Sequence, residues 1–134
     1  MPGYSGTPLP KKLGIKPGFR LLFIDVPSEV LADLKSSTAG CEIVRSRKVQ
    51  IDFAMVFAKS RSMLSTEFNR LEKQLSPAGM LWASWPKKSA GVATDLDENV
   101  VREIGLAASL VDVKVCAVTE IWSGLKFVRR LKDR

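Results

Sequence analysis

Two short, almost continuously apolar runs constrain most strongly what this chain can fold into. They are Phe19 to Val26 (FRLLFIDV) and Ile51 to Ala58 (IDFAMVFA). A strand that is buried on both faces of a sheet has this pattern, whereas a strand with one wet face alternates apolar and polar residues. The two runs therefore predict neighbouring strands in the interior of a parallel sheet.

The segments between and after these runs carry helical patterns. Residues 28–37 (SEVLADLKSS) begin with Ser28 as a predicted helix N-cap. From residue 61 to 75 the apolar side chains recur at steps of four, three and four, which is the period of an amphipathic helix. Asp95, with Glu98 three residues later, predicts a capping box for a helix that continues to about Leu110.

The other strands are weaker predictions. CEIV at 41–44 is short, MLWASW at 80–85 follows a helix-breaking SPAG segment, and two β-rich runs at 113–121 and 125–131 flank the Trp122-Ser123-Gly124 turn of a predicted hairpin. The order is then strand, helix, strand, strand, helix, strand, helix, strand, strand. This order predicts an α/β fold: a single doubly wound, mostly parallel sheet with helices on both faces and a C-terminal antiparallel hairpin, in the Rossmann-like manner.

With 134 residues, the chain has the usual length of one domain. We expect a Pro/Gly-rich basic arm over residues 1–18 and a single α/β domain over residues 19–134. The net charge of +7 belongs to the two ends, because residues 21–128 balance to zero. Basic ends of this kind are commonly solubility features, and the sequence holds no recognisable reading helix or aromatic RNA motif, so we do not expect nucleic acid as the partner.

Cys41 and Cys116 lack the paired spacing of metal or redox motifs and are predicted to be separate buried residues. No apolar run is long enough to cross a bilayer, and the polar N-terminus is unlike a signal peptide, so we expect a cytoplasmic protein without a membrane partner. The arm has two alternative roles. Its GYSGTP segment offers donors for an anion, or the arm lies across a second copy in a homodimer.

Several chemistries are excluded by composition. The chain has no histidine, which removes Ser-His-Asp and Cys-His arrangements and the zinc sites built on histidine. Neither a phosphate-binding G-x-x-x-x-G-K-[ST] loop nor a G-x-G-x-x-G turn occurs. We therefore expect no metal and no nucleotide hydrolysis of the common types.

A ligand crevice is expected outside the carboxyl ends of the strands, where the strand order reverses. In SWPKK, Pro86 fixes the chain where two ammonium groups stand beside an aromatic plane, which suits a phosphate-bearing or nucleotide-like ligand. The alternative is a solvated loop with a core tryptophan. The predicted lining residues are Asp25, Ser28, Lys59, Ser60, Ser84, Trp85, Lys87 and Lys88.

Two local patterns, KPGFRLLFID and LEKQLSPAGMLWASW, resemble S-adenosylmethionine-dependent methyltransferases, as does the closing hairpin. Nearly the whole chain also resembles a family of small bacterial proteins without an established activity. The segments that carry this likeness are GYSGTPLPKKLGIKPG, SWPKK, DLDENVVRE, LVDVKVCAV and WSGLKFVRR.

The chain departs from the methyltransferase pattern at two places. The resemblance implies a glycine-rich turn after the first strand, but residues 25–29 (DVPSE) contain no glycine. It also implies an acidic residue that closes the second strand and holds ribose hydroxyls, but Arg45 stands near that place. These departures favour a non-catalytic or degenerate methyltransferase-like domain that binds a small anionic ligand or a protein partner. Two alternatives remain: a divergent transferase, with or without S-adenosylmethionine as its cofactor, that uses Asp25 or Lys87, and nucleic-acid binding through the basic termini.

Overall fold

Six strands form one sheet in the order β2-β1-β3-β4-β6-β5. The structure, a computed structural model, describes residues 8–134. The strands are β1 (Arg20–Ile24), β2 (Glu42–Ile43), β3 (Ile51–Phe57), β4 (Leu75–Pro86), β5 (Leu110–Ala117) and β6 (Trp122–Arg129). The helices are α1 (Leu9–Leu13), α2 (Ser28–Thr38), α3 (Arg61–Glu72) and α4 (Glu98–Ala107), with short 3₁₀ turns at Lys88–Ala90 and Leu131–Asp133.

The sheet is mostly parallel, as the sequence predicts. Strands β2, β1, β3 and β4 run parallel, while β6 is antiparallel to both β4 and β5. The predicted C-terminal hairpin and the Rossmann-like class are therefore confirmed. The chain leaves β1 toward β2 on one side and returns to β3 on the other, so the strand order reverses between β1 and β3. This reversal is where open α/β sheets bind ligands.

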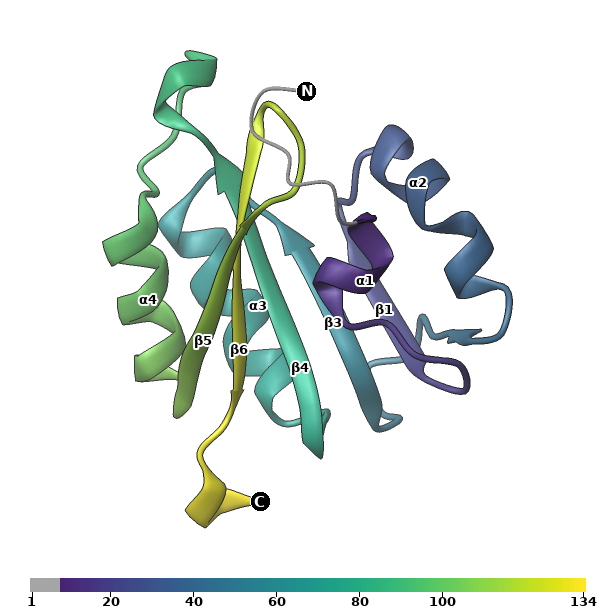
Figure 1. The fold of residues 1–134 in the computed structure, drawn as a ribbon. Helices are drawn as coiled ribbons and strands as arrows, with labels where there is room; N and C mark the ends of the chain where they lie inside the picture. The colour runs from purple at the N-terminus through teal and green to yellow at the C-terminus, as the bar shows by residue number, and fades with distance from the viewer. Residues whose placement is uncertain (1–7) are drawn as a thin grey trace.

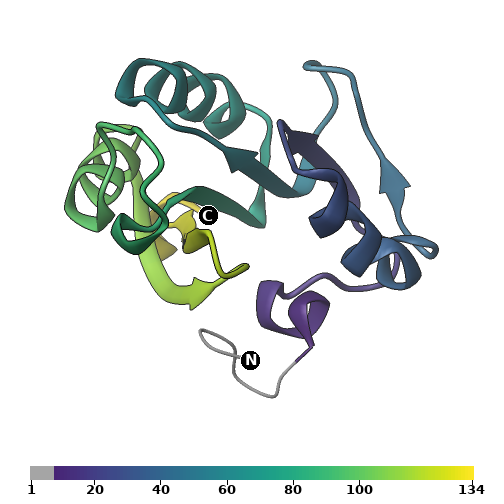
Figure 2. The ribbon, with the colours of Figure 1, turned by 90° about the horizontal axis from the view of Figure 1, so that it is seen from above.

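Helices cover both faces of the sheet (Figures 1 and 2). One buried cluster packs α1 and α2 against the sheet face that carries Leu21, Phe53 and Trp82. A second cluster packs α3 and α4 against the opposite face, which carries Ala54 and Leu81. Burial on both sides explains why β1 and β3 read as continuous apolar runs.

Several boundaries differ from the sequence predictions. Pro27, and not Ser28, is the N-cap of α2, so Ser28 is the first helical residue. Asp97, and not Asp95, caps α4, because its Oδ1 accepts a hydrogen bond from the Val100 amide at 2.9 Å. The hairpin turn lies at residues 118–121, and Trp122 to Gly124 belong to β6.

Helix α3 ends earlier than its apolar period suggests. It stops at Glu72, and the SPAG segment belongs to the start of β4. The Arg129 guanidinium from β6 donates to the backbone oxygens of Glu72 and Leu75 and pairs with the Glu72 carboxylate at 2.8 Å. A cation that binds the last carbonyls of a helix stabilises its end.

Part of the predicted arm packs onto the sheet. Leu9 and Leu13 of α1 are buried, and the Trp82 indole donates to the Leu13 carbonyl at 2.9 Å. The domain boundary at residue 19 stays a prediction. Residues 1–7, which hold most of GYSGTP, lie outside the described residues, so the anion-binding and dimer-arm hypotheses also stay predictions.

Within residues 8–134, no helix is both long and apolar enough to span a membrane. Cys41 and Cys116 are free and half-buried. The predicted cytoplasmic location stays a prediction.

Candidate functional site

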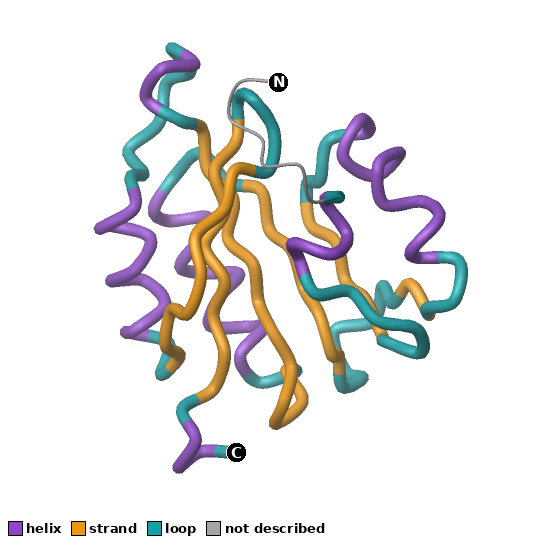
Figure 3. The backbone as a smooth tube through the Cα atoms, viewed as in Figure 1, coloured by secondary structure: helices purple, strands orange, loops and turns teal. Residues whose placement is uncertain are grey.

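The shortness of β2 opens one edge of β1. The two strands pair only at Arg20 with Glu42 and at Leu21 with Ile43. After Ile43 the chain leaves the sheet and crosses β1 through residues 44–50, which contain no helix (Figure 3). Within the described part of the chain, Phe23 and Ile24 therefore pair with β3 alone.

The crossing segment is fixed in place on the α3 side of the sheet. Val44 is buried in the core, and the Gln74 amide nitrogen donates to the carbonyls of Ser46 and Val49 at 2.7 and 2.8 Å. Arg47 pairs with Glu67 of α3 at 3.0 Å. The open edge of β1 is thus a built feature of the fold, because the segment that crosses the strand is anchored.

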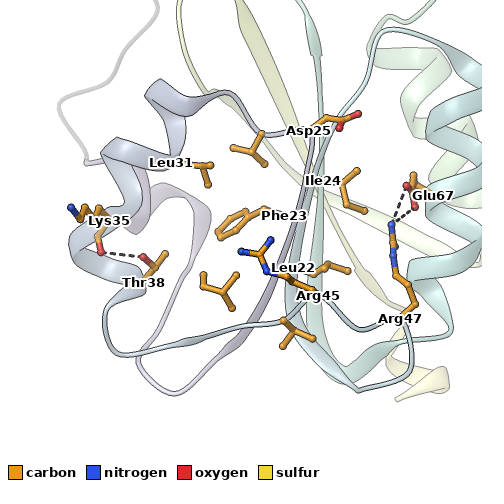
Figure 4. A pocket seen from close by; sticks show the side chains of 13 residues that line it. Leu22, Phe23, Ile24, Asp25, Leu31, Lys35, Thr38, Arg45, Arg47 and Glu67 are labelled. Atoms are coloured by element: carbon orange, nitrogen blue, oxygen red, sulfur yellow. Dashed lines mark hydrogen bonds and ion pairs between the residues drawn. The ribbon is translucent and has the colours of Figure 1, made fainter.

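A pocket of about 780 Å³ fills this gap, and we call it the β1-edge pocket (Figure 4). Its size falls within the usual range for small-molecule sites. It is lined by Leu22, Phe23, Ile24, Asp25, Val26, Leu31, Lys35, Thr38, Ile43, Val44, Arg45, Arg47 and Glu67. It lies beside the second half of β1, next to the strand reversal.

Its apolar wall comes from three elements: Phe23 on β1, Leu31 on α2 and Ile43 on β2. Helix α2 buries Val30 and Leu34 against the sheet and leaves Leu31 40% exposed, while Ile43 is 46% exposed. These two side chains give the pocket an exposed aliphatic wall.

The polar groups of the pocket are Asp25, Lys35, Arg45 and the Arg47–Glu67 pair. Figure 4 shows the Arg45 guanidinium pointing into the pocket beside the Phe23 ring, while the Lys35 ammonium points outward. Because Glu67 neutralises Arg47, Arg45 is the unpaired inward cation in the part of the chain that the structure describes.

Asp25 closes β1 in a left-handed backbone conformation, with φ of +54°. L-residues avoid this region, and Asp and Asn are the non-glycine residues that tolerate it best. The sequence lacks the expected glycine, yet the backbone after β1 still takes a turn that glycine favours. This conformation at the end of β1 makes Asp25 a candidate functional residue.

Asp25 also lines a second pocket, of about 470 Å³, at the carboxyl end of β3. The other lining residues are Phe57, Ala58, Lys59, Ser60, Met63 and Trp122. Phe57 and Trp122 form an edge-to-face pair with ring centroids 4.9 Å apart. The structure therefore brings three predicted site residues together here: Asp25, Lys59 and Ser60.

The remaining predicted residues lie elsewhere. Trp85, Lys87 and Lys88 line a third pocket of about 340 Å³ with the start of α4. Trp85 is only 5% exposed, and the fully buried Ser84 hydroxyl donates to the Ser123 carbonyl at 2.7 Å. Ser28 is exposed and lines none of the three pockets. The binding role of the eight residues stays a prediction.

The sequence analysis missed most of the β1-edge pocket. Phe23 and Ile43 lie in segments that the sequence predicts as strands, and Leu31 lies in the helix predicted over residues 28–37. The only signal was Arg45, which stands where a carboxylate was expected. The pocket exists because β2 is two residues long, and no local pattern states how far a strand will pair.

No protein-family model matches the sequence, and no curated protein matches it. The likeness to a small bacterial family therefore stays a prediction.

Solved structures are similar at the level of the fold. The magnesium protoporphyrin IX methyltransferase of Synechocystis, solved with bound SAH, has a TM-score of 0.60 and 10% identity, over 91% of this chain and 78% of that chain. Precorrin-6y C5,15-methyltransferase of Geobacter metallireducens has a TM-score of 0.59 and 9% identity, over 91% and 86%. The fibrillarin pre-rRNA processing protein of Methanococcus jannaschii has a TM-score of 0.54 and 10% identity, over 93% and 70%. The chain thus has a methyltransferase-like Rossmann fold.

Proposed function

We propose that this chain is a divergent methyltransferase-like domain that binds a nucleoside ligand of the S-adenosylmethionine class in the β1-edge pocket. The observation that carries the proposal is a pocket of ligand size beside β1, next to the strand reversal of a methyltransferase-like sheet. Two of the similar solved structures are described with bound SAH or SAM.

The residues of the pocket fit the parts of such a ligand. A purine base has two flat apolar faces, for which Leu31 and Ile43 offer exposed aliphatic surface. A carboxylate on the ligand would pair with the inward guanidinium of Arg45. Hydroxyls or an ammonium group would bind the carboxylate of Asp25.

The glycine-free turn is less of an obstacle than the sequence suggests. Glycine serves such a turn by allowing positive φ and by letting backbone approach the ligand. Asp25 already has positive φ, so the first of these two needs is met without glycine. Pro27 has no amide hydrogen and cannot donate to a ligand, which restricts donors in this turn to the residues around it.

When bound, S-adenosylmethionine supplies a methyl group on a sulfonium centre. The role of this chain would be to place a methyl acceptor beside that methyl group. Asp25 lines both the β1-edge pocket and the second pocket, so its carboxylate stands where a ligand and an acceptor would meet. A carboxylate there can orient the acceptor and take up its proton.

A second candidate is a non-catalytic domain that binds a nucleotide-like anion. Arg45 favours it, because an arginine near the end of β2 matches a phosphate better than it matches ribose hydroxyls. The two candidates share the pocket and differ in the ligand.

Calorimetric titration with S-adenosylhomocysteine, S-adenosylmethionine and ADP tests both. We expect the two sulfur ligands to bind with micromolar affinity and the Leu31→Glu variant to weaken them at least about tenfold, since the substitution places a charge on the apolar wall. Leu106→Glu is the matched control, because Leu106 is a similarly exposed helix leucine, on α4, that lines none of the three pockets.

The ligand ranking separates the candidates. Tighter binding of ADP that depends on Arg45 would favour the non-catalytic domain. If none of the three ligands binds, or if both glutamate variants lose affinity equally, the proposal is wrong.

A further inference from the structure

The second pocket, at the carboxyl end of β3, shares Asp25 with the β1-edge pocket. Ile24 and Val56 are the last paired residues of β1 and β3, so Asp25 and Phe57 both follow the same rung of the sheet. The second pocket has about 470 Å³, which is within the usual range for small molecules. A molecule in this pocket and a ligand in the β1-edge pocket would therefore both contact Asp25.

The wall of the second pocket is mainly aromatic. Phe57 is 3% exposed, and its ring meets the ring of the half-buried Trp122 edge to face, with centroids 4.9 Å apart and planes at 64°. Met63, near the start of α3, and Ala58 complete the apolar lining. Aromatic rings and a thioether pack favourably against a further aromatic ring. The wall thus fits a flat aromatic ring.

Asp25 and Lys59 give the second pocket one group of each charge. None of the ion pairs within residues 8–134 includes either side chain. The backbone carbonyl of Lys59 accepts hydrogen bonds from the Thr94 hydroxyl at 2.6 Å and from the Asp95 amide at 3.4 Å. These bonds fix the backbone at Lys59 and leave its ammonium for a ligand.

We propose that the second pocket binds an aromatic carboxylic acid that carries a hydroxyl group, and that this acid is the methyl acceptor of the domain. Its ring would lie against Phe57 and Trp122. Its carboxylate would pair with the Lys59 ammonium and accept from the Ser60 hydroxyl, while its own hydroxyl would donate to Asp25. A single ammonium beside a protein carboxylate suits a monoanion better than a phosphate dianion.

The acceptor role rests on the proposed binding of S-adenosylmethionine in the β1-edge pocket. In the transfer, the hydroxyl oxygen of the acid forms a bond to the methyl carbon, and the bond from that carbon to sulfur breaks with its electron pair left on sulfur. The hydroxyl proton passes to the Asp25 carboxylate. The products are the methyl ether of the acid and S-adenosylhomocysteine, so no further reactant is needed.

Calorimetric titration of the full chain with para-hydroxybenzoate tests the binding of the acid. Two analogues serve as controls: para-hydroxybenzyl alcohol lacks the carboxylate, and the cyclohexane analogue keeps the hydroxyl and the carboxylate but lacks the flat ring. We expect para-hydroxybenzoate to bind at least about fivefold more tightly than either analogue, because only this compound uses both the cation and the aromatic wall.

The Lys59→Gln variant tests the cation. It should weaken the binding of para-hydroxybenzoate at least about fivefold, since a charge-assisted hydrogen bond is lost, and leave the binding of the alcohol unchanged. Lys73→Gln is the matched control, because Lys73 is an exposed lysine at the other end of α3 that lines none of the three pockets. A thermal melt shows that both variants fold.

Equal binding of the acid and the alcohol, or equal effects of the two glutamine variants, would overturn the assignment of the pocket. If S-adenosylhomocysteine binds and para-hydroxybenzoate does not, this inference is wrong and the proposed function stands. If the acid binds and neither sulfur ligand does, the proposed function and the acceptor role are both wrong, and the pocket remains a site for aromatic acids.

Mass spectrometry of the protein mixed with S-adenosylmethionine and para-hydroxybenzoate tests the transfer. We expect the methyl ether of the acid to form. Binding of both compounds without any methyl ether would overturn the acceptor role.

Discussion

Asp25 has a left-handed backbone conformation and lines two pockets. Substitutions at this position show how much the conformation costs the folded chain. Alanine keeps the Cβ at positive φ but loses the carboxylate that lets Asp tolerate this region. We expect Asp25→Ala to lower the free energy of unfolding by about 1 kcal/mol and Asp25→Gly to leave it unchanged or higher, as measured by urea denaturation. Equal losses in the two variants would show that φ of +54° carries no strain.

Burial lowers the pKa of Lys126, and the charges of its cross-strand partner Lys114 and of Lys16 lower it further. The lowered pKa of Lys126 predicts that the free energy of unfolding depends on pH. At neutral pH its ammonium is charged in the folded and the unfolded chain, so the full cost of holding it on the folded surface is present. As the pH rises through the lowered folded pKa toward the usual lysine value, the folded chain releases its proton first and this cost disappears.

The Lys126→Gln variant should therefore be more stable than the wild type at neutral pH, by about 0.5 kcal/mol. The difference in stability between the two proteins should shrink in alkaline buffer, because Lys126 then loses its charge. The other titrating groups are common to both proteins, so their effects cancel in the comparison. Parallel urea titrations at several pH values measure it. A difference that stays constant or grows with pH would contradict the assignment.

At the scale of the elements, α4 depends on the Asp97 cap. Replacing Asp97 by alanine leaves the Val100 amide without its side-chain acceptor, and we expect a loss of about 1 kcal/mol in the free energy of unfolding. Asp97→Asn keeps an acceptor at the same place and should recover most of the loss. Equal destabilisation by alanine and asparagine would mean that charge, rather than the cap, supports the helix.

The elements that sequence places well are those that local patterns specify. The runs at β1 and β3 and the amphipathic period of α3 needed no tertiary information. The cap of α4 required tertiary information. The Asp95 carboxylate accepts a hydrogen bond from the Arg61 amide at 2.8 Å, a contact across 34 positions, and so does not cap the helix. Gly124 suggested a turn, but it lies in β6, where a Cβ would stand 2.8 Å from Val118 and 3.2 Å from Trp82.

At the scale of the whole molecule, α1 helps to complete one of the two cores. Leu13 is fully buried, and we expect Leu13→Ala to cost about 2–5 kcal/mol because it leaves a cavity beside Trp82. Leu131 is 81% exposed, and Leu131→Ala should change stability by less than about 0.5 kcal/mol. Thermal or urea unfolding compares the two. If they behave alike, α1 does not belong to the folded domain.

The candidate site is a property of the whole fold more than of any motif. The sequence places Asp25, Lys59 and Ser60 near one another through the rule that ligands bind where strand order reverses. It does not place Leu31 and Ile43 around one pocket, because that requires β2 to end after two residues. Nor does it bring Lys16 close enough to Lys126 for the charge of Lys16 to lower the pKa of Lys126.

A crystal structure of the chain grown with S-adenosylhomocysteine tests the central claim most directly. The account predicts the ligand in the β1-edge pocket, with its base between Leu31 and Ile43 and its amino-acid end between Asp25 and Arg45. A ligand bound elsewhere, or an empty pocket at saturating ligand, would contradict it.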